Sequence, residues 1–115
     1  GYQITDEDGK AEFITIYPGW YQGRTPHIHF KIRTDPTSDR GYEFTSQLFF
    51  DDDLSDEIYV QEPYSQKTGR RTYNEGDGIY RSGGDQLTLQ VTKAENEEGY
   101  TATFDIGLDT SDDAL

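Results

Sequence analysis

The fold is decided by the stretch PGWYQGRTPHIHFKIR, residues 18–33. In its second half, Ile28, Phe30 and Ile32 alternate with polar residues, which is the pattern of a β-strand with one apolar face. Side chains two residues apart on a strand point to the same side. His27 and His29, the only two histidines of the chain, are therefore expected to converge on one point of the polar face.

The residues just before the histidines favour a metal site there. Pro26 directly precedes the pair, and proline is tolerated at the first position of a strand. Tyr21 and Arg24 add a phenol and a permanent positive charge. A His-x-His pair can also lie on a solvated sheet face, and Arg24 taken alone can be an exposed ion pair. The combination of these groups indicates metal ligation, because imidazole binds transition metals readily.

Length and composition predict one β-rich domain. The chain has 115 residues, enough for a single compact domain over residues 1–115. Only 31% of the residues are hydrophobic, but nine tyrosines and six phenylalanines can build a core. Without cysteine there is neither a disulfide nor a thiolate metal site. No apolar stretch approaches the roughly 20 residues of a membrane-spanning helix, so no membrane partner is expected. Cytoplasmic and secreted locations both remain open.

The charge of the chain argues against nucleic acid as a partner. The net charge is −13, from 23 acidic and 10 basic residues, whereas phosphate binding needs clustered lysine and arginine. The acidity fits an ordinary solvated surface and equally a halophilic protein, in which salt screens the repulsion between carboxylates. Residues 109–115 are expected to be an acidic tail.

Short strands separated by turns predict an all-β fold. Besides 27–33, strands are expected over residues 1–5, 13–17, 42–50, 86–93 and 100–108, with Asp8-Gly9 as a hairpin turn and polar loops over 35–41 and 64–80. This pattern indicates an antiparallel β-sandwich, and a closed barrel remains open.

Residues 51–60 are the one expected helix, since aspartates suit its positive N-terminal end. A calcium loop starting at Asp51 is not favoured. Its sixth position is Asp56, where the sharp turn of such a loop needs glycine.

The motif Pro-Gly-x-Tyr-x-x-Arg-x-x-His-x-His, residues 18–29, resembles the signature of the intradiol ring-cleavage dioxygenases. This family comprises catechol, protocatechuate and hydroxyquinol dioxygenases, which are non-haem ferric enzymes that open a catechol between its two hydroxyls. Residues 6–16 resemble the hairpin before the motif, and residues 45–50 resemble a strand that bears a glutamine. The resemblance implies a prealbumin-like β-sandwich, and it implies that the chain is the C-terminal part of a longer catalytic domain.

Transferred by position, the resemblance implies Fe(III) as the cofactor and Tyr21, His27 and His29 as its ligands. It implies that Arg24 stabilises negative charge on the substrate and that Gln47 lines the substrate pocket. Tyr21 would be the ligand that leaves iron when the diol binds and takes up a substrate proton. The substrates implied are a small aromatic diol and O2, and the product is a muconate-type diacid.

One ligand of the family pattern has no counterpart in the chain. The family binds iron through two tyrosines and two histidines, and the second tyrosine is expected upstream of Gly1. Tyr2 and Tyr17 do not fit that position. This chain by itself is therefore expected to have a weak or empty iron site and to be inactive in isolation.

Two other interpretations remain. A cupin also uses His-x-His, but its motif adds a glutamate that residues 30–34 lack. The second is a prealbumin-like binding or interaction module without catalysis, whose metal site is incomplete or holds another metal. Colour separates this module from the enzyme, because tyrosinate bound to Fe(III) absorbs visible light. The oligomeric state is left open, a homo-oligomer included.

Overall fold

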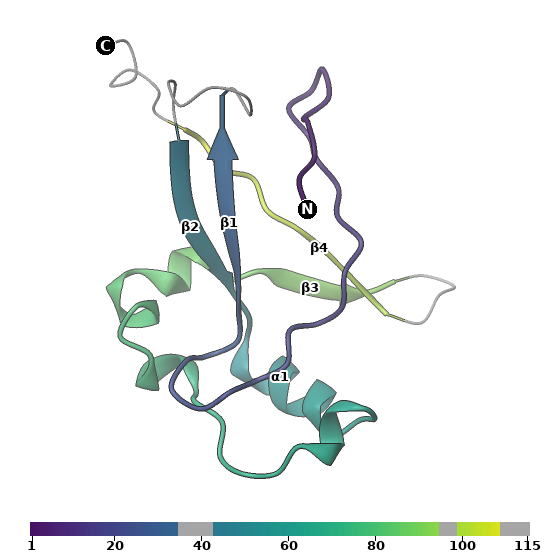
Figure 1. Cartoon of the computed structure of the whole chain (residues 1–115), viewed down its shortest axis with the longest axis vertical. Coiled ribbons are helices and arrows are strands. Elements are labelled where there is room, and N and C mark those ends of the chain that lie inside the picture. Colours follow the sequence, from purple (N-terminus) through teal and green to yellow (C-terminus); the bar gives the residue numbers. More distant parts are fainter. Residues whose placement is uncertain (35–42, 95–98, 109–115) are drawn as a thin grey trace.

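The structure is a computed structural model that describes residues 1–34, 43–94 and 99–108. The structure has two pairs of antiparallel strands, one α-helix and several short 3-10 helices in the segment between α1 and β3 (Figure 1). The strands are β1 (His27–Arg33), β2 (Glu43–Phe49), β3 (Gln90–Lys93) and β4 (Tyr100–Thr103), and the helix is α1 (Asp52–Tyr59). No helix in the described ranges is long and apolar enough to cross a membrane.

The β1–β2 pair confirms the strand predicted from the histidine motif. β1 has the predicted bounds, and β2 lies within the predicted range 42–50. The two strands are antiparallel, with His27 opposite Phe49 and His29 opposite Gln47. Because directly opposed residues share a face of the ladder, both histidines and Gln47 lie on the same side of the pair. The loop expected over 35–41 falls outside the described residues.

Helix α1 begins and ends almost where the sequence predicts. Asp51 is its N-cap, and the Oδ1 atom of Asp51 accepts hydrogen bonds from the backbone N–H groups of Asp53 at 2.8 Å and Leu54 at 3.4 Å. Such a cap satisfies N–H groups that have no partner inside the helix. Ile58 and Tyr59 are buried on the face towards the body of the chain.

The second strand pair is shorter than predicted. Residues 86–93 do not form one strand, because a 3-10 helix, η4 (Gly84–Leu87), occupies the start of that range and only β3 remains. This 3-10 helix packs closely, since a Cβ atom at Gly84 would lie 2.5 Å from Cδ2 of Tyr80 and 3.1 Å from Cδ2 of Phe49. Likewise, β4 ends at Thr103, within the predicted range 100–108. The tail predicted over 109–115 lies outside the described residues.

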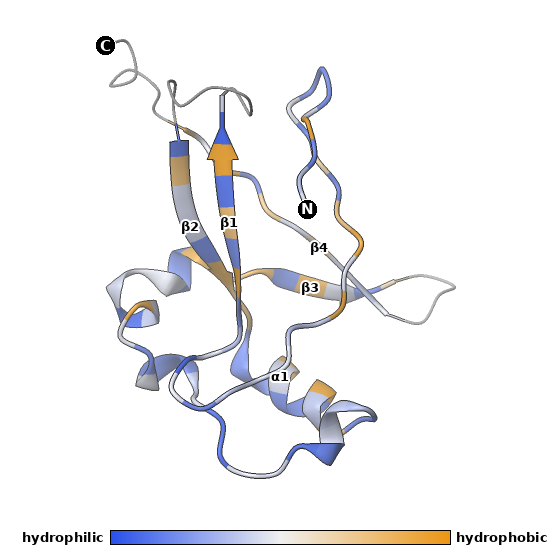
Figure 2. Cartoon of the chain, viewed as in Figure 1, coloured by the Kyte–Doolittle hydropathy of each residue, from blue (hydrophilic) through white to orange (hydrophobic). Residues whose placement is uncertain are grey.

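Strands predicted over residues 1–5 and 13–17 are not formed in the described structure. The turn between them is present, since the Oδ1 atom of Asp6 accepts hydrogen bonds from the N–H groups of Asp8 and Lys10, each at 2.9 Å. The flanking segments have no ladder partner among the residues described. Their apolar side chains are exposed, Ile14 by 97%. Figure 2 shows the hydrophobic positions along this N-terminal segment. A strand is completed only by hydrogen bonds to a neighbour, so the alternating pattern alone was insufficient.

The apolar core lies where β2 meets α1 rather than between two sheets. Its buried members are Phe49, Phe50, Ile58, Tyr59 and Leu89. The region predicted as a loop carries η1 (Tyr64–Gln66), η2 (Asn74–Gly76) and η3 (Tyr80–Ser82). The ring of Tyr80 packs edge-on against that of Phe49 at 5.2 Å. The fold is thus β-rich with one α-helix, as predicted, but the described residues do not form a complete sandwich.

Arg71 connects α1 to the segment before η2 through hydrogen bonds. Its side chain is only 6% exposed, and its Nε atom donates to Asp56 Oδ1 at 2.9 Å. Nη1 donates to the carboxylate of Asp52 and the carbonyl of Thr72, and Nη2 donates to the carboxylate and carbonyl of Asp52. The guanidinium also stacks on the ring of Tyr73, 3.7 Å from its centroid.

Replacing Arg71 by lysine tests this connection. Lysine keeps the charge but lacks the planar fork, so Arg71→Lys should lower the free energy of unfolding by about 1–2 kcal/mol. Denaturant unfolding measures this change. Arg70→Lys is the matched control and should be neutral, since the exposed Arg70 contacts no described residue through its guanidinium. Equal stability of the two variants would contradict the role of Arg71.

Candidate metal centre

A tight turn brings Tyr21 and Arg24 together before β1. Tyr21 and Arg24 form an isolated antiparallel bridge around Gln22 and Gly23. Gly23 has a φ of +107°, a conformation that a side chain would strain. Its N–H donates to Thr72 Oγ1 at 2.8 Å, which attaches the turn to the chain after η1. The Tyr21 side chain is 51% exposed and its phenol is accessible to a ligand or metal.

His27 is held with one ring nitrogen available for a metal. Its Nδ1 atom lies 2.8 Å from the carbonyl oxygen of Thr25. Because a carbonyl only accepts, Nδ1 carries the proton, and the lone pair of the neutral ring is on Nε2. Metal-binding histidines commonly donate their other N–H in this way. His29 is exposed on the same face of β1.

The structure brings the two predicted substrate residues into contact. Arg24 Nη2 donates to Gln47 Oε1 at 2.6 Å, although the two residues are 23 positions apart. Arg24 Nε donates to Asp77 Oδ2 at 2.7 Å. Nη1 makes no hydrogen bond to residues 1–34, 43–94 or 99–108. The guanidinium is therefore fixed by two of its nitrogens and has one nitrogen left for a ligand.

Asp77 is the partner that sequence reasoning missed. Its side chain is fully buried, so the ion pair with Arg24 is not the exposed one that the sequence allowed. Oδ2 also accepts from the N–H of Thr25 at 2.8 Å, and Oδ1 accepts from Ile79 at 2.8 Å and Tyr80 at 3.1 Å. Burial raises the pKa of the Asp77 carboxyl, but the Arg24 guanidinium and the backbone donors lower it more, so this pKa lies below its usual value.

Thr25 joins the turn to the 3-10 region. It is completely buried, and its hydroxyl donates to Asn74 Oδ1 at 2.5 Å. Asn74 in turn donates from Nδ2 to the carbonyl of Phe50 at 2.8 Å. Among the described residues, no buried side-chain nitrogen or oxygen lacks a hydrogen-bond partner. No local pattern in the sequence indicated that residues 74–77 would meet the motif.

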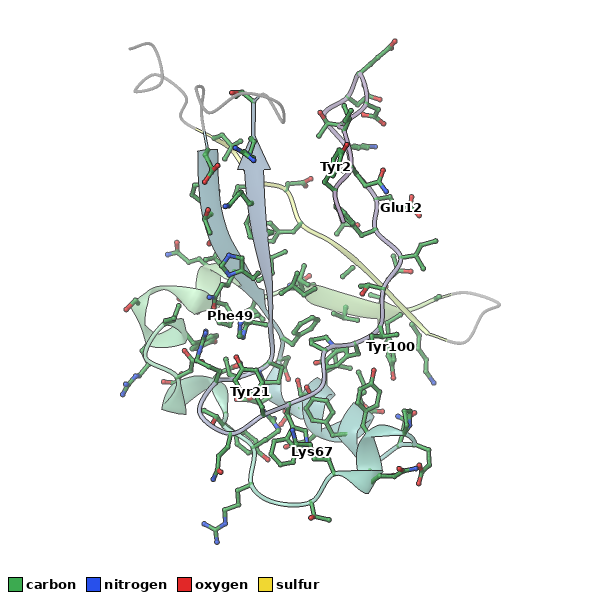
Figure 3. All side chains as sticks on the ribbon, in the orientation of Figure 1. Tyr2, Glu12, Tyr21, Phe49, Lys67 and Tyr100 are labelled. Carbon is green, nitrogen blue, oxygen red and sulfur yellow. The ribbon has the colours of Figure 1, made fainter. Side chains whose placement is uncertain are left out.

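The other tyrosines considered as ligands lie away from this centre. Tyr17 shares a 2.6 Å hydrogen bond with Ser55, and burial raises the pKa of its phenol to about 12. Tyr2 is exposed on the N-terminal segment, well separated from Tyr21 (Figure 3).

The donors predicted for this centre are two imidazoles and one phenol, from His27, His29 and Tyr21. No group of three or more His, Cys, Asp or Glu residues suited to a metal occurs in the described part of the chain. The predicted donors fit a ferric ion, because phenolate is a hard donor and imidazole accepts iron.

Two solved structures are similar to this β-rich chain, in which a tyrosine, an arginine and a His-x-His strand follow one another. An intradiol ring-cleavage dioxygenase from Tetranychus urticae matches with a TM-score of 0.69 and 36% identity, over 78% of this chain and 43% of that one. A second structure, a crystal structure of a dioxygenase, matches with a TM-score of 0.68, 36% identity and the same shares. The similarity to intradiol ring-cleavage dioxygenases predicted from the sequence is confirmed.

The chain spans less than half the length of these two proteins, 43% in each case. No family model matches the chain, and no curated protein matches it either.

The Arg24–Asp77 pair predicts a pH-dependent contribution to stability. Arg24→Gln leaves a buried carboxylate without its charged partner, so the free energy of unfolding at pH 7 should fall by about 2 kcal/mol. Because the folded-state pKa of Asp77 is lowered, the pair contributes fully above the ordinary carboxyl pKa of about 4. This contribution to stability is lost as the pH falls through the folded-state pKa of Asp77.

Denaturant unfolding of the wild type and Arg24→Gln at pH 7, 5 and 3 measures this effect. The difference in free energy of unfolding between the two proteins should be the same at pH 7 and pH 5 and should become smaller at pH 3. Equal stabilities at pH 7 would show that the ion pair contributes nothing.

Proposed function

We propose that the protein is a non-haem Fe(III) dioxygenase that opens a catechol-type ring between its two hydroxyls with O2 and yields a muconate-type diacid. Its role would be the breakdown of small aromatic compounds. One observation supports this reaction most. Arg24 is hydrogen-bonded to Gln47, which is opposite His29 in the β1–β2 ladder, so the proposed substrate residues adjoin the proposed metal ligands.

In this proposal Tyr21, His27 and His29 hold the iron, and a tyrosine from outside this chain is the fourth ligand. When bound, Fe(III) supplies an electron-accepting centre that makes a catecholate reactive towards O2. The hydrogen bond from His27 Nδ1 to the Thr25 carbonyl supports the assignment of His27, because it directs the lone pair to Nε2.

The residues of this chain would bind the diol and handle its charge and proton. Arg24 stays charged at any working pH, and its unengaged Nη1 can donate to an oxygen of the anionic substrate. Because Asp77 and Gln47 fix the guanidinium beforehand, little reorganisation is needed when negative charge develops. The accessible Tyr21 Oη can accept a proton from a hydroxyl of the diol.

The second candidate is a β-rich binding module without catalysis. One observation favours it, because the described residues contain no group of three or more His, Cys, Asp or Glu suited to a metal. Such a module would bind another metal, or none, and would be colourless.

Oxygen uptake separates the two candidates. The complete gene product, loaded with Fe(III), should consume one O2 for each catechol, protocatechuate or hydroxyquinol that it opens, with at least one of the three as a substrate. An oxygen electrode and the absorbance of the diacid product measure this reaction. No uptake with any diol, by protein that contains stoichiometric iron, would favour the binding module.

The visible colour of the iron-loaded protein tests the assignment of Tyr21. Tyr21→Phe removes the proposed phenolate ligand, so the band should weaken and shift, and iron should bind at least tenfold more weakly. Tyr17→Phe is the matched control, since the phenol of Tyr17 is bonded to Ser55 and should not affect the band. An unchanged spectrum in Tyr21→Phe would exclude Tyr21 as a ligand.

A further inference from the structure

The two carboxylate oxygens of Asp77 accept hydrogen bonds from two different parts of the chain. Oδ1 accepts from the N–H groups of Ile79 and Tyr80 and so closes the turn that starts η3. Oδ2 faces the opposite way and accepts from Arg24 Nε at 2.7 Å and from the Thr25 N–H at 2.8 Å. A turn alone requires only the first oxygen. The second is directed at the motif that carries the proposed metal and substrate residues.

Thr25 extends this contact to His27. Its N–H is held by Asp77, its hydroxyl by Asn74, and its carbonyl accepts the Nδ1 proton of His27. Pro26 follows and restricts the backbone of Thr25 to an extended conformation. With the N–H, the side chain and the backbone conformation all fixed, the direction of the Thr25 carbonyl is fixed as well. That carbonyl determines which ring nitrogen of His27 is protonated.

We propose that Asp77 is a positioning residue that orients Arg24 directly and His27 through Thr25, so that a single buried carboxylate aligns the substrate arginine with a metal ligand. This inference rests on the proposed function for the roles of Arg24 and His27. The hydrogen bonds on which the inference depends, from Asp77 to Arg24 and Thr25 and from His27 to Thr25, are observed in this chain and do not depend on the reaction.

The chemistry of the contacts requires a carboxylate at position 77. Four N–H donors converge on the two oxygens of a fully buried side chain. An ionised carboxylate accepts all four, and its bonds to charged donors are the strongest kind. Asparagine has the same shape but presents an NH2 group to one pair of donors, whichever way its amide is turned. Asp77→Asn therefore disturbs the orientation of Arg24 and Thr25 without changing side-chain volume.

Zinc binding tests the connection to His27 without reference to activity. Titration of the complete protein with Zn(II), corrected for binding that persists in His27→Gln, should give an affinity at least tenfold lower in Asp77→Asn than in the wild type. Arg71→Lys is the control for lost stability, because it loosens the neighbouring network without touching Thr25, and it should bind zinc as the wild type does. Wild-type zinc affinity in Asp77→Asn would overturn the proposal.

The proton position on His27 supplies a second test, whose first measurement uses the wild type alone. Nitrogen-15 NMR of the metal-free wild type, at a pH where the ring is neutral, should show His27 with the proton on Nδ1. In Asp77→Asn a mixture of the two tautomers should appear. A wild-type His27 with its proton on Nε2 would overturn the proposal.

Measurements of turnover distinguish the effect of Asp77 on Arg24 from its effect on His27. Arg24→Gln should lower kcat about 100-fold and keep wild-type zinc affinity, whereas Asp77→Asn should lower both. An Asp77→Asn variant that keeps the wild-type kcat would overturn the proposal that Asp77 orients Arg24. If the iron-loaded wild type consumes no O2, the proposed function fails, and the zinc and NMR results still decide whether Asp77 positions His27.

Discussion

The burial of one charged side chain, Asp77, is the constraint on which the geometry of the histidine motif depends. A carboxylate inside a protein must be paired and hydrogen-bonded, or the cost of removing it from water is not offset. Asp77 meets this requirement with Arg24, Thr25 and the turn before Tyr80, and so ties two segments 53 residues apart. The apolar core is small and lies beside this cluster, so directional polar contacts rather than apolar packing fix the motif loop.

Local patterns explain which elements were predicted correctly. β1 follows from the alternation around His27 and His29, and α1 from the aspartates at its start, because both signals depend on neighbours a few residues away. The Arg24–Gln47 hydrogen bond joins two residues to which the resemblance assigns substrate roles. Asp77 could not be found in this way, since the residues around it indicate only a turn. The start of β3 was misplaced for a similar reason, because the packing of η4 at Gly84 against Phe49 is a tertiary contact.

The N-terminal segment shows the limit of a strand pattern. Residues 13–17 are rich in strand-forming residues, yet Ile14 is almost fully exposed and no described residue pairs with the segment. A helix satisfies its hydrogen bonds within itself, whereas a strand needs a second segment beside it. The sequence therefore predicted the extended conformation and the turn at Asp8-Gly9, but a pattern within one segment carries no information about a partner.

A comparison of two arginines supports the choice of Arg24 for a substrate role. Arg71 is 6% exposed, and all three of its guanidinium nitrogens donate to Asp52, Asp56 or Thr72. Its hydrogen-bonding capacity is used within the fold, which is the mark of a structural residue. Arg24 is 25% exposed, and two of its nitrogens are held while Nη1 has no partner in the described residues. A group that stabilises developing charge must be immobilised before the reaction and must keep a donor for the ligand. Arg24 meets both conditions and Arg71 meets only the first, so the ion pair with Asp77 is part of what would make Arg24 effective.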